Sequence, residues 1–280
     1  MYNLVHLDGD ILAYRSAAAC EKAHYQLEFF KDGVRHNLTF ENAAECSSFI
    51  KANKIEDFIR ETFKDLGPVE LVYYNIRTTL DNVYDKLNPD NIYIYLTGTD
   101  NFRKALTPEY KANRDPTKRP THLEAARQYL MQEYGAIMCN GYEADDGIGI
   151  NYKNGSGTIA SIDKDLKQIA GQHYDWVKDE AVIVSDDEAD LFFWRQMLIG
   201  DVTDNVHGVK GIGPVKAAKI IHADLGLEER MDAVLDVYKK HKLDFQENYH
   251  LLRVLRSEEE YKKVRSWITA RDREKQVPTE

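Results

Sequence analysis

The chain has 280 residues, 43% of them hydrophobic, and a formal net charge of −10 at pH 7. This length and composition are typical of a soluble globular protein with one large domain or two smaller ones. No apolar run approaches the length that spans a bilayer, and the first ten residues lack a secretory-signal pattern, so we expect a cytoplasmic protein. The three cysteines are too widely spaced to predict a disulfide framework or a zinc site.

Strands and helices are predicted to alternate along the first two-thirds of the chain. Short apolar, aromatic or β-branched runs predict strands at 3–7, 24–30, 34–40, 92–96, 136–140, 158–162 and 181–184. Apolar residues at helical spacing predict helices at 11–23, 42–66, 122–134, 144–152, 189–199, 214–225, 228–241, 244–256 and 258–271. Residues 69–74 fit either a strand or the start of a helix through residue 87.

Local signals set some boundaries of these elements. Asp32-Gly33 lies between two β-type runs and predicts the turn of a hairpin. Gly135 ends a predicted helix, and Ser185 with Glu188 makes a capping box before another. The alternation predicts an α/β fold whose mostly parallel central sheet carries helices on both faces. Function is then expected at the carboxyl ends of the strands.

Carboxylates gather where the predicted elements end, in the clusters LDGD at 7–10, EADD at 143–146, SIDKD at 161–165 and GDVTDN at 200–205. With one further acid they are Asp8, Asp10, Asp100, Glu143, Asp145, Asp146, Asp163, Asp165, Asp201 and Asp204. Crowded carboxylates repel one another unless a cation neutralises them. Because hard oxygen ligands suit Mg²⁺ or Mn²⁺, the pattern predicts a site for two or more such ions. Paired ions of this kind cleave phosphodiesters.

Each acidic cluster also has a simpler interpretation. The acids at 143–146 open a predicted helix, where carboxylates cap the helix and complement its dipole. Asp163 and Asp165 follow a strand, as the phospho-acceptor of a receiver domain does. Asp201 and Asp204 would equally suit a solvated turn. The density of acids at 143–146 and the number of separate clusters favour the metal site.

A glycine-rich segment, GVKGIGPVK at 208–216, precedes a predicted helix. Its glycines let a backbone approach a phosphate closely, and the first N–H groups of the helix can donate to that phosphate. Pro214 suits the first turn of the helix. The segment predicts a helix–hairpin–helix that binds the DNA backbone without reading its sequence. The alternative is a purely structural turn between two helices.

Cations alternate with aromatic residues between 102 and 115, although the chain is acidic overall. Such a segment is typical of a channel that holds single strands by neutralising phosphates and stacking on bases. Lys111 and Arg114 stand three apart in a segment that we expect to become helical around DNA, and such a helix would present them on one face. A solvated charged surface is the alternative.

Together these motifs resemble the 5′→3′ exonuclease/flap endonuclease family, especially the stand-alone replication exonucleases of tailed phages. The resemblance runs from about Leu4 to Gly226. It implies metal ligands at Asp8, Asp100, Glu143, Asp145, Asp146, Asp163, Asp165, Asp201 and Asp204, and catalytic roles for Arg15, Lys111 and Arg114. It implies DNA contacts at Arg103, Lys104, Tyr110, Gly208, Lys210, Gly211, Gly213 and Lys216, and a K⁺ ion at the glycine hairpin. Asp10, residues 25–40 and the tail after about 226 do not match the family pattern.

The resemblance further implies a PIN-like α/β nuclease core at 1–195 with a helical arch at about 100–122. A helical DNA-binding region follows at 196–280, with a helix–three-turn–helix at about 196–226. The expected activity is that of a Mg²⁺- or Mn²⁺-dependent 5′→3′ exonuclease or 5′ flap endonuclease in phage DNA replication, inside the host cytoplasm. Its expected partners are DNA ends, flaps and nicks, and RNA:DNA hybrids. The alternatives are a non-cleaving, structure-specific DNA-binding protein and a PIN-type endoribonuclease, which would leave the glycine hairpin without a role.

Overall fold

The computed structural model describes residues 3–152 and 157–276. Its centre is a six-stranded sheet with the order β6-β5-β1-β7-β8-β9. The parallel strands are β1 (Leu4–Asp8), β5 (Asn91–Asn101), β6 (Ile137–Gly141), β7 (Thr158–Ala160) and β8 (Gly171–Asp175). The edge strand β9 (Glu180–Val184) pairs with β8 in the antiparallel sense. The predicted α/β class with a mostly parallel sheet is confirmed.

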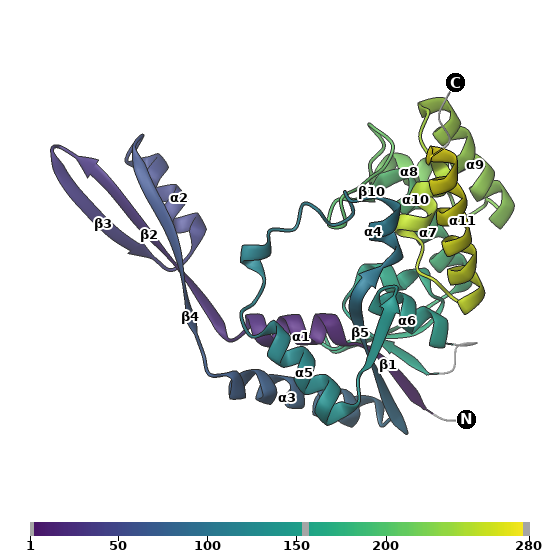
Figure 1. Ribbon diagram of the computed structural model, residues 1–280, viewed down its shortest axis with the longest axis horizontal. Coiled ribbons are helices and arrows are strands. Elements are labelled where there is room, and N and C mark those ends of the chain that lie inside the picture. The colour runs from purple at the N-terminus through teal and green to yellow at the C-terminus, as the bar shows by residue number, and fades with distance from the viewer. Residues whose placement is uncertain (1–2, 153–156, 277–280) are drawn as a thin grey trace.

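Alternating side chains of the central strands make two separate cores. On one face, Val5 and Leu7 of β1 pack with the helices α1 (Gly9–Ala18), α3 (Val69–Leu87) and α5 (Leu123–Tyr134). On the other face, Tyr95 of β5 and Ile159 of β7 pack against α6 (Ala144–Asn151). This arrangement is visible in Figure 1. Residues 69–74, for which the sequence fits either a strand or a helix, form the start of the helix α3.

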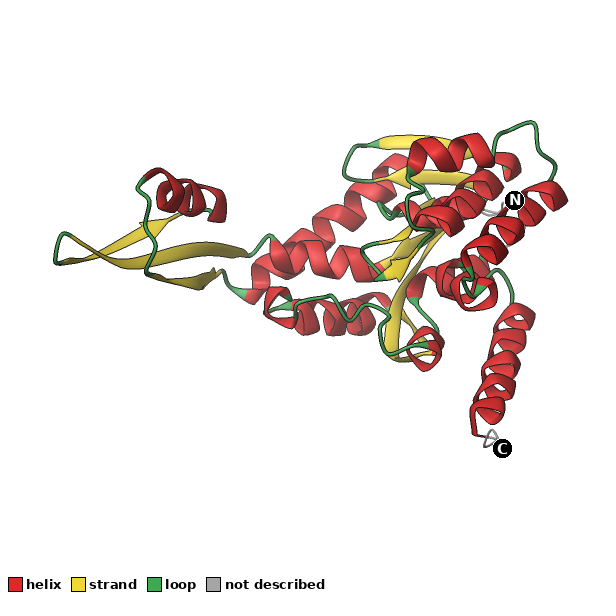
Figure 2. Ribbon diagram, turned by 90° about the horizontal axis from the view of Figure 1, so that it is seen from above, coloured by secondary structure: helices red, strands yellow, loops and turns green. Residues whose placement is uncertain are grey.

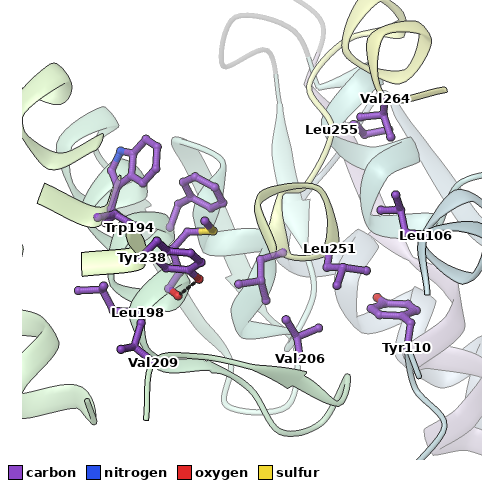
Figure 3. Packing of buried hydrophobic residues seen from close by; sticks show 14 of the residues in the cluster. Leu106, Tyr110, Trp194, Leu198, Val206, Val209, Tyr238, Leu251, Leu255 and Val264 are labelled. Atoms are coloured by element: carbon purple, nitrogen blue, oxygen red, sulfur yellow. Dashed lines mark hydrogen bonds between the residues drawn. The ribbon is translucent and has the colours of Figure 1, made fainter. Parts of the chain in front are cut away.

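The helices from residue 186 onwards, together with α4, make a helical layer with a core of its own (Figure 3). The helices are α4 (Phe102–Leu106), α7 (Asp186–Ile199), α8 (Pro214–Ile220), α9 (Leu227–His241), α10 (Phe245–Leu252) and α11 (Glu258–Gln276). The predicted capping box of Ser185 and Glu188 begins α7. The predicted boundary between the nuclease core (1–195) and the DNA-binding region (196–280) falls inside α7, which continues to Ile199. In the described ranges, no helix is both long and apolar enough to cross a membrane.

A three-stranded antiparallel sheet projects from the core as an arm (Figures 1 and 2). The sheet has the order β3-β2-β4, with β2 at Glu21–Lys31, β3 at Val34–Phe40 and β4 at Phe58–Leu66. The arm also contains the helix α2 (Ala43–Ala52), which lies between β3 and β4 in the chain. The predicted hairpin turn at Asp32-Gly33 is confirmed. The predicted helix at 42–66 is wrong, because it ends at Ala52 and β4 pairs along β2. The paired residues of β2 lie 29 to 45 positions earlier in the chain, so local periodicity does not reveal them.

The segment 107–122, here called the arch, crosses from α4 towards α5 (Figure 1). The expected helical arch is not helical in this structure, because between α4 and α5 it contains only the short 3₁₀ helix η1 (Pro116–Lys118). Two features oppose a helix here. Lys111 has a φ of 57°, in the left-handed region, and Pro116 disfavours a helical conformation at Asp115.

Candidate active site

Acids from three elements lie near one another at the carboxyl ends of the parallel strands. Asp8 ends β1 and caps α1, where one of its oxygens accepts from the N–H of Ile11 at 3.1 Å. Its second oxygen accepts from Ser161 Oγ at 2.9 Å. Asp163 follows β7 and caps the 3₁₀ helix η2 (Lys164–Gln168), and Asp145 lies in the first turn of α6. Asp8, Asp145 and Asp163 are called the central acids below.

Burial and repulsion within this cluster raise the pKa of two of the central acids, Asp8 and Asp145. Burial raises the pKa of Asp8 to about 7, and the nearby charges of Asp10 and Asp163 add to this effect. The pKa of Asp145 also lies well above its usual range, first through burial and then through the charges of Asp8 and Asp163. Repulsion of this kind is relieved by a bound cation. The electrostatics of the central acids therefore favour a cation site.

The chemistry of these side chains fits a hard divalent ion, because all their donors are carboxylate oxygens. In the part of the chain that the structure describes, however, no group of three or more His, Cys, Asp or Glu side chains is arranged to hold a metal ion. The central acids are close enough for their charges to raise the pKa of Asp8 and Asp145, but they do not converge on one point. Metal binding would therefore require at least one of these side chains to turn.

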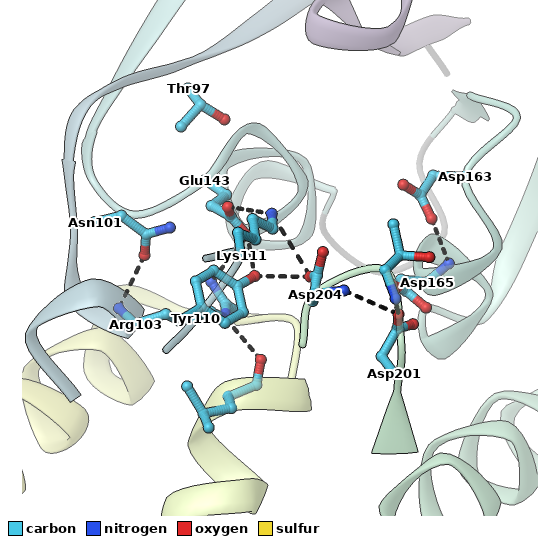
Figure 4. A network of polar contacts seen from close by, with 12 residues as sticks. Thr97, Asn101, Arg103, Tyr110, Lys111, Glu143, Asp163, Asp165, Asp201 and Asp204 are labelled. Atoms are coloured by element: carbon cyan, nitrogen blue, oxygen red, sulfur yellow. Dashed lines mark hydrogen bonds and ion pairs between the residues drawn. The ribbon is translucent and has the colours of Figure 1, made fainter. Parts of the chain in front are cut away.

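Asp165 and Asp201 form a second acidic pair beside the central acids (Figure 4). Gln196 of α7 donates to both, to Asp165 Oδ1 at 2.8 Å and to Asp201 Oδ2 at 3.3 Å. Burial raises the pKa of Asp165 to about 6, with help from the charge of Asp163. Burial would also raise the pKa of Asp201, but the ion pair with Lys164 and two backbone N–H bonds lower it instead. Within this pair, the neighbouring donors outweigh the cost of burying the charge for Asp201 but not for Asp165.

A third acidic pair, Glu143 and Asp204, holds the arch (Figure 4). Tyr110 Oη lies 2.8 Å from Glu143 Oε2 and 2.8 Å from Asp204 Oδ2. The Lys111 ammonium forms an ion pair with Glu143 and lies 3.6 Å from Asp204 Oδ2, and Arg114 donates to Asp204 Oδ1 at 2.9 Å. Although burial would raise the pKa of Glu143, the charges of Lys111 and Arg103 lower it to about 2. Lys111 and Arg114 therefore reach the acidic site without the predicted helix.

The structure corrects the predictions for Arg103 and Asp146. Arg103 is only 3% exposed, so it is not a surface contact for DNA. Its guanidinium makes a two-pronged ion pair with Asp146, at 2.5 and 2.9 Å, and donates to the carbonyl of Leu251 at 2.9 Å. Asp146 is fully buried and also accepts from the N–H of Leu255 at 2.9 Å. With its oxygens satisfied in this way, Asp146 is not free to bind a metal ion.

Tyr110 and Asp100 also differ from expectation. Tyr110 is only 3% exposed, so its ring does not offer a stacking surface to a base, and its hydroxyl orients Glu143 and Asp204 instead. Asp100 is exposed near the end of β5 and, among the described residues, has no hydrogen bond or ion pair with the other acids. The strand continues four residues beyond Thr97, whose N–H donates to Asp10 at 3.0 Å. Asp100 therefore lies three residues further along β5 than this bond.

Sequence reasoning missed the residues that orient the acids. Asp10 forms an ion pair with Arg127 of α5, so it anchors two helices beside Asp8. Gln196 and Lys164 link Asp165 to Asp201. Arg127 and Gln196 sit within ordinary helical patterns, and their partners are distant in sequence or in another element. No local signal identifies them. Arg15 and Lys104 are exposed, and their predicted roles stay predictions.

The glycine segment lies between the short hairpin of β10 (Gly200–Asp201) and β11 (Val206–His207) and the helix α8. Gly211 and Gly213 are exposed, and a Cβ atom added to either would meet nothing within 4 Å. Lys216 closes the turn by donating to the Gly211 carbonyl at 2.8 Å. Gly208 differs from them, because an added Cβ would lie 2.2 Å from the Ile199 backbone. Gly208 is therefore required by packing, whereas Gly211 and Gly213 leave an open backbone surface next to exposed Lys210.

A fold of this class with acids at the carboxyl edge of its sheet has known counterparts. Residues 61–192 match the family described as "5′-3′ exonuclease, N-terminal resolvase-like domain". A 5′-3′ exonuclease of Mycoplasma pneumoniae is 28% identical over 244 residues, which cover 79% of this chain and 72% of that protein. The exodeoxyribonuclease of Enterobacteria phage T3 is 34% identical over 134 residues, 44% of each chain. The chain is homologous to 5′-3′ exonucleases, and by that homology it is a 5′-3′ exonuclease.

Solved structures show the same fold. A T5 protein co-crystallised with metal ions superposes with a TM-score of 0.56 at 15% identity, covering 96% of this chain and 98% of that one. A mutant T5 5′-exonuclease gives a TM-score of 0.53 at 14% identity, with 96% and 99% covered. DNA polymerase I of Caldicellulosiruptor bescii is 31% identical over 152 residues, but this chain spans only 18% of that protein.

Proposed function

We propose that this 5′-3′ exonuclease uses divalent ions, Mg²⁺ or Mn²⁺, to hydrolyse phosphodiesters at DNA 5′ ends, flaps and nicks. The observation that carries the proposal is the mutual repulsion of Asp8, Asp145 and Asp163 at the carboxyl edge of the sheet. A nuclease that bound no cation would have little reason to keep three acids in so costly an arrangement. The likeness to a T5 protein that was crystallised with metal ions adds support.

The side chains divide into three roles in this proposal. The central acids, with Asp165 and Asp201, would hold the ions. Bound ions of this kind activate water and neutralise charge on the phosphate and the leaving oxygen. Lys111 and Arg114 would leave Glu143 and Asp204 and turn to the phosphate, where a point charge and a two-pronged donor stabilise developing charge. Asp10, Tyr110 and Gln196 would orient the acids.

The binding region is proposed to be the open glycine turn. The exposed backbone at Gly211 and Gly213 and the charge of Lys210 would hold the phosphates of a duplex, with a K⁺ ion as a further partner there. DNA is the proposed substrate, and RNA:DNA hybrids formed in phage DNA replication are a further one. We propose residues 1–195 as the catalytic region and residues 196–280 as the DNA-binding region.

Cleavage of a 5′-labelled flap, a nicked duplex and a blunt duplex tests this proposal directly. With Mg²⁺ the protein should release short 5′ products from the DNA substrates, and excess EDTA should stop the reaction. Single-stranded RNA of the same sequence serves as the matched control. Preferential cleavage of that RNA would favour a PIN-type endoribonuclease. Duplex binding without any divalent-dependent cleavage would favour the non-cleaving DNA-binding protein.

Gly213→Ala should weaken duplex binding without disturbing the fold. The position has a φ of −106° and open space around it, so alanine fits and its methyl group blocks only an approaching phosphate. We expect the dissociation constant for a blunt duplex to rise about tenfold, the cost of losing a charge-assisted hydrogen bond of roughly 1.5 kcal/mol. Gly226→Ala is the matched control, because Gly226 is also a helix N-cap, has a φ of −69°, and an added Cβ would make only an ordinary contact at 3.6 Å. An unchanged duplex affinity, with an unchanged melting temperature, would remove the glycine turn from the DNA-binding surface.

A further inference from the structure

A groove of about 760 Å³ runs beside the acidic site, between the edge of the central sheet and the helices α7 and α8. Its walls come from η2, β9, α7 and the start of α8. Lys164 and Gln196 line one part, and both contact the acidic pair Asp165 and Asp201. Pro214 and Ala218 line another part, and Pro214 directly follows the glycine turn. The groove therefore connects the acids with the glycine turn.

The charge of the groove is opposite to that of the whole chain. Three cations line it, Lys164, Lys167 and Arg195, against one acid, Glu188. The chain as a whole has a net charge of −10. A local excess of positive charge on an acidic protein favours an anionic ligand. The ion pair of Lys164 with Asp201 offsets part of this charge, so Lys167 and Arg195 carry most of it.

Apolar side chains lie beside these cations. Ile183 of the edge strand β9 is 81% exposed and Val182 is 47% exposed, although both line the groove. Phe192 of α7 lines it as well and is half-buried. Cations next to apolar and aromatic surface fit a ligand that carries phosphates on one side and flat rings on the other. A single strand of nucleic acid has this chemistry, whereas a duplex keeps its bases covered.

We propose that this groove binds an unpaired segment of the nucleic-acid substrate, with its phosphates on Lys167 and Arg195 and its bases over Ile183 and Phe192. The inference rests on the proposed nuclease function, since the groove is continuous with that site. An apolar peptide that adds a strand to β9 is the competing occupant. The positive charge and the continuity with both the acids and the glycine turn favour nucleic acid.

Removing one groove charge should change the salt dependence of binding. Lys167 is exposed, so Lys167→Gln should fold normally. For a single-stranded oligonucleotide in EDTA, the slope of log Kd against log salt should fall by about 0.7, the contribution of one phosphate contact. Lys51→Gln, on the exposed side of α2 in the arm, removes the same charge away from the groove and should change the slope by less than about 0.2.

Cross-linking tests the position of the strand without cleavage. Cys20, Cys46 and Cys139 are all buried, so a cysteine placed at exposed Ile183 becomes the accessible thiol. In EDTA, Ile183→Cys should cross-link to a haloacetyl-labelled single strand at least about tenfold more than Val34→Cys on the arm, and an unlabelled strand should compete. Lys167→Gln should reduce that yield.

Equal cross-linking at both positions, or equal salt slopes for Lys167→Gln and Lys51→Gln, would overturn the strand assignment in favour of a peptide or no occupant. Both measurements are made without divalent ions and are scored without turnover. A wild-type protein that cleaves nothing would therefore refute the proposed nuclease function. The same cross-linking and salt slopes would still decide whether the groove binds a strand.

Discussion

Asp145→Asn should raise the melting temperature of the protein while lowering its cleavage rate by about 10²–10³-fold or more. The pKa of Asp145 is raised in the folded state, so its ionised form destabilises the fold above the pKa that the group has when unfolded. Asparagine removes the repulsion from Asp8 and Asp163 and, in the proposed site, removes a metal ligand too. For a chain of this size, each ~1 kcal/mol of relief raises the melting temperature by about 2–4 °C. The stability measurement is thermal unfolding at pH 8 in EDTA.

Asp201→Asn provides the matched contrast. The pKa of Asp201 is lowered in the fold because its ion pair with Lys164 and its backbone hydrogen bonds outweigh burial. Its ionised form therefore stabilises the protein at pH 8, and asparagine should lower the melting temperature while also reducing cleavage. Asp232→Asn, on the exposed surface of α9, should change neither quantity.

Two outcomes would contradict the prediction for Asp145. Turnover at the wild-type rate in Asp145→Asn would remove that residue from the catalytic site. A lower melting temperature of Asp145→Asn would contradict the repulsion between Asp145 and its neighbours.

The acids at strand ends could be predicted from the sequence because their placement is local. Asp8 directly follows the buried run at 5–7, and Asp163 follows the loop after β7, so the parallel order of β1 and β7 brings both to one edge. The same local logic found the capping box at Ser185 and the hairpin turn at Asp32. In each case a strand end or turn signal lies within a few residues of the predicted feature.

Burial and long-range pairing could not be read in the same way. Arg103 belongs to a cation-rich segment, but its partner Asp146 lies 43 residues later, and the carbonyls that it binds come from residues near 251. A buried ion pair and a surface cation have the same sequence pattern. Asp146 was misassigned for the same reason, since a capping acid and a metal ligand both open a helix. The predicted helix over β4 is wrong for a related reason, because pairing with the distant strand β2 decides the structure of β4.

Lys111→Ala should lower the single-turnover cleavage rate by about 10²–10³-fold while changing the dissociation constant of the substrate far less. In the structure the Lys111 ammonium pairs with Glu143 and lies 3.6 Å from Asp204. It is therefore placed at the acidic site and not on the outer surface. If it turns to the phosphate, its charge stabilises the transition state more than the bound ground state. Arg114→Lys should cleave more slowly than the wild type although it keeps the positive charge, because lysine lacks the two-pronged guanidinium.

The competing interpretation is that Lys111 only fastens the arch to Glu143 and Asp204. Tyr110→Phe separates the two, because the Tyr110 hydroxyl bonds the same two carboxylates but carries no charge. A fastening role predicts similar losses of rate for Tyr110→Phe and Lys111→Ala, whereas charge stabilisation predicts a much larger loss for Lys111→Ala. Lys104→Ala, exposed on α4, controls for the loss of a cation and should stay within about twofold of wild type. Rates are compared at saturating enzyme and at two salt concentrations, since an effect on binding alone disappears at saturation. If Lys111→Ala falls within the range of Lys104→Ala under those conditions, Lys111 has no part in the chemical step.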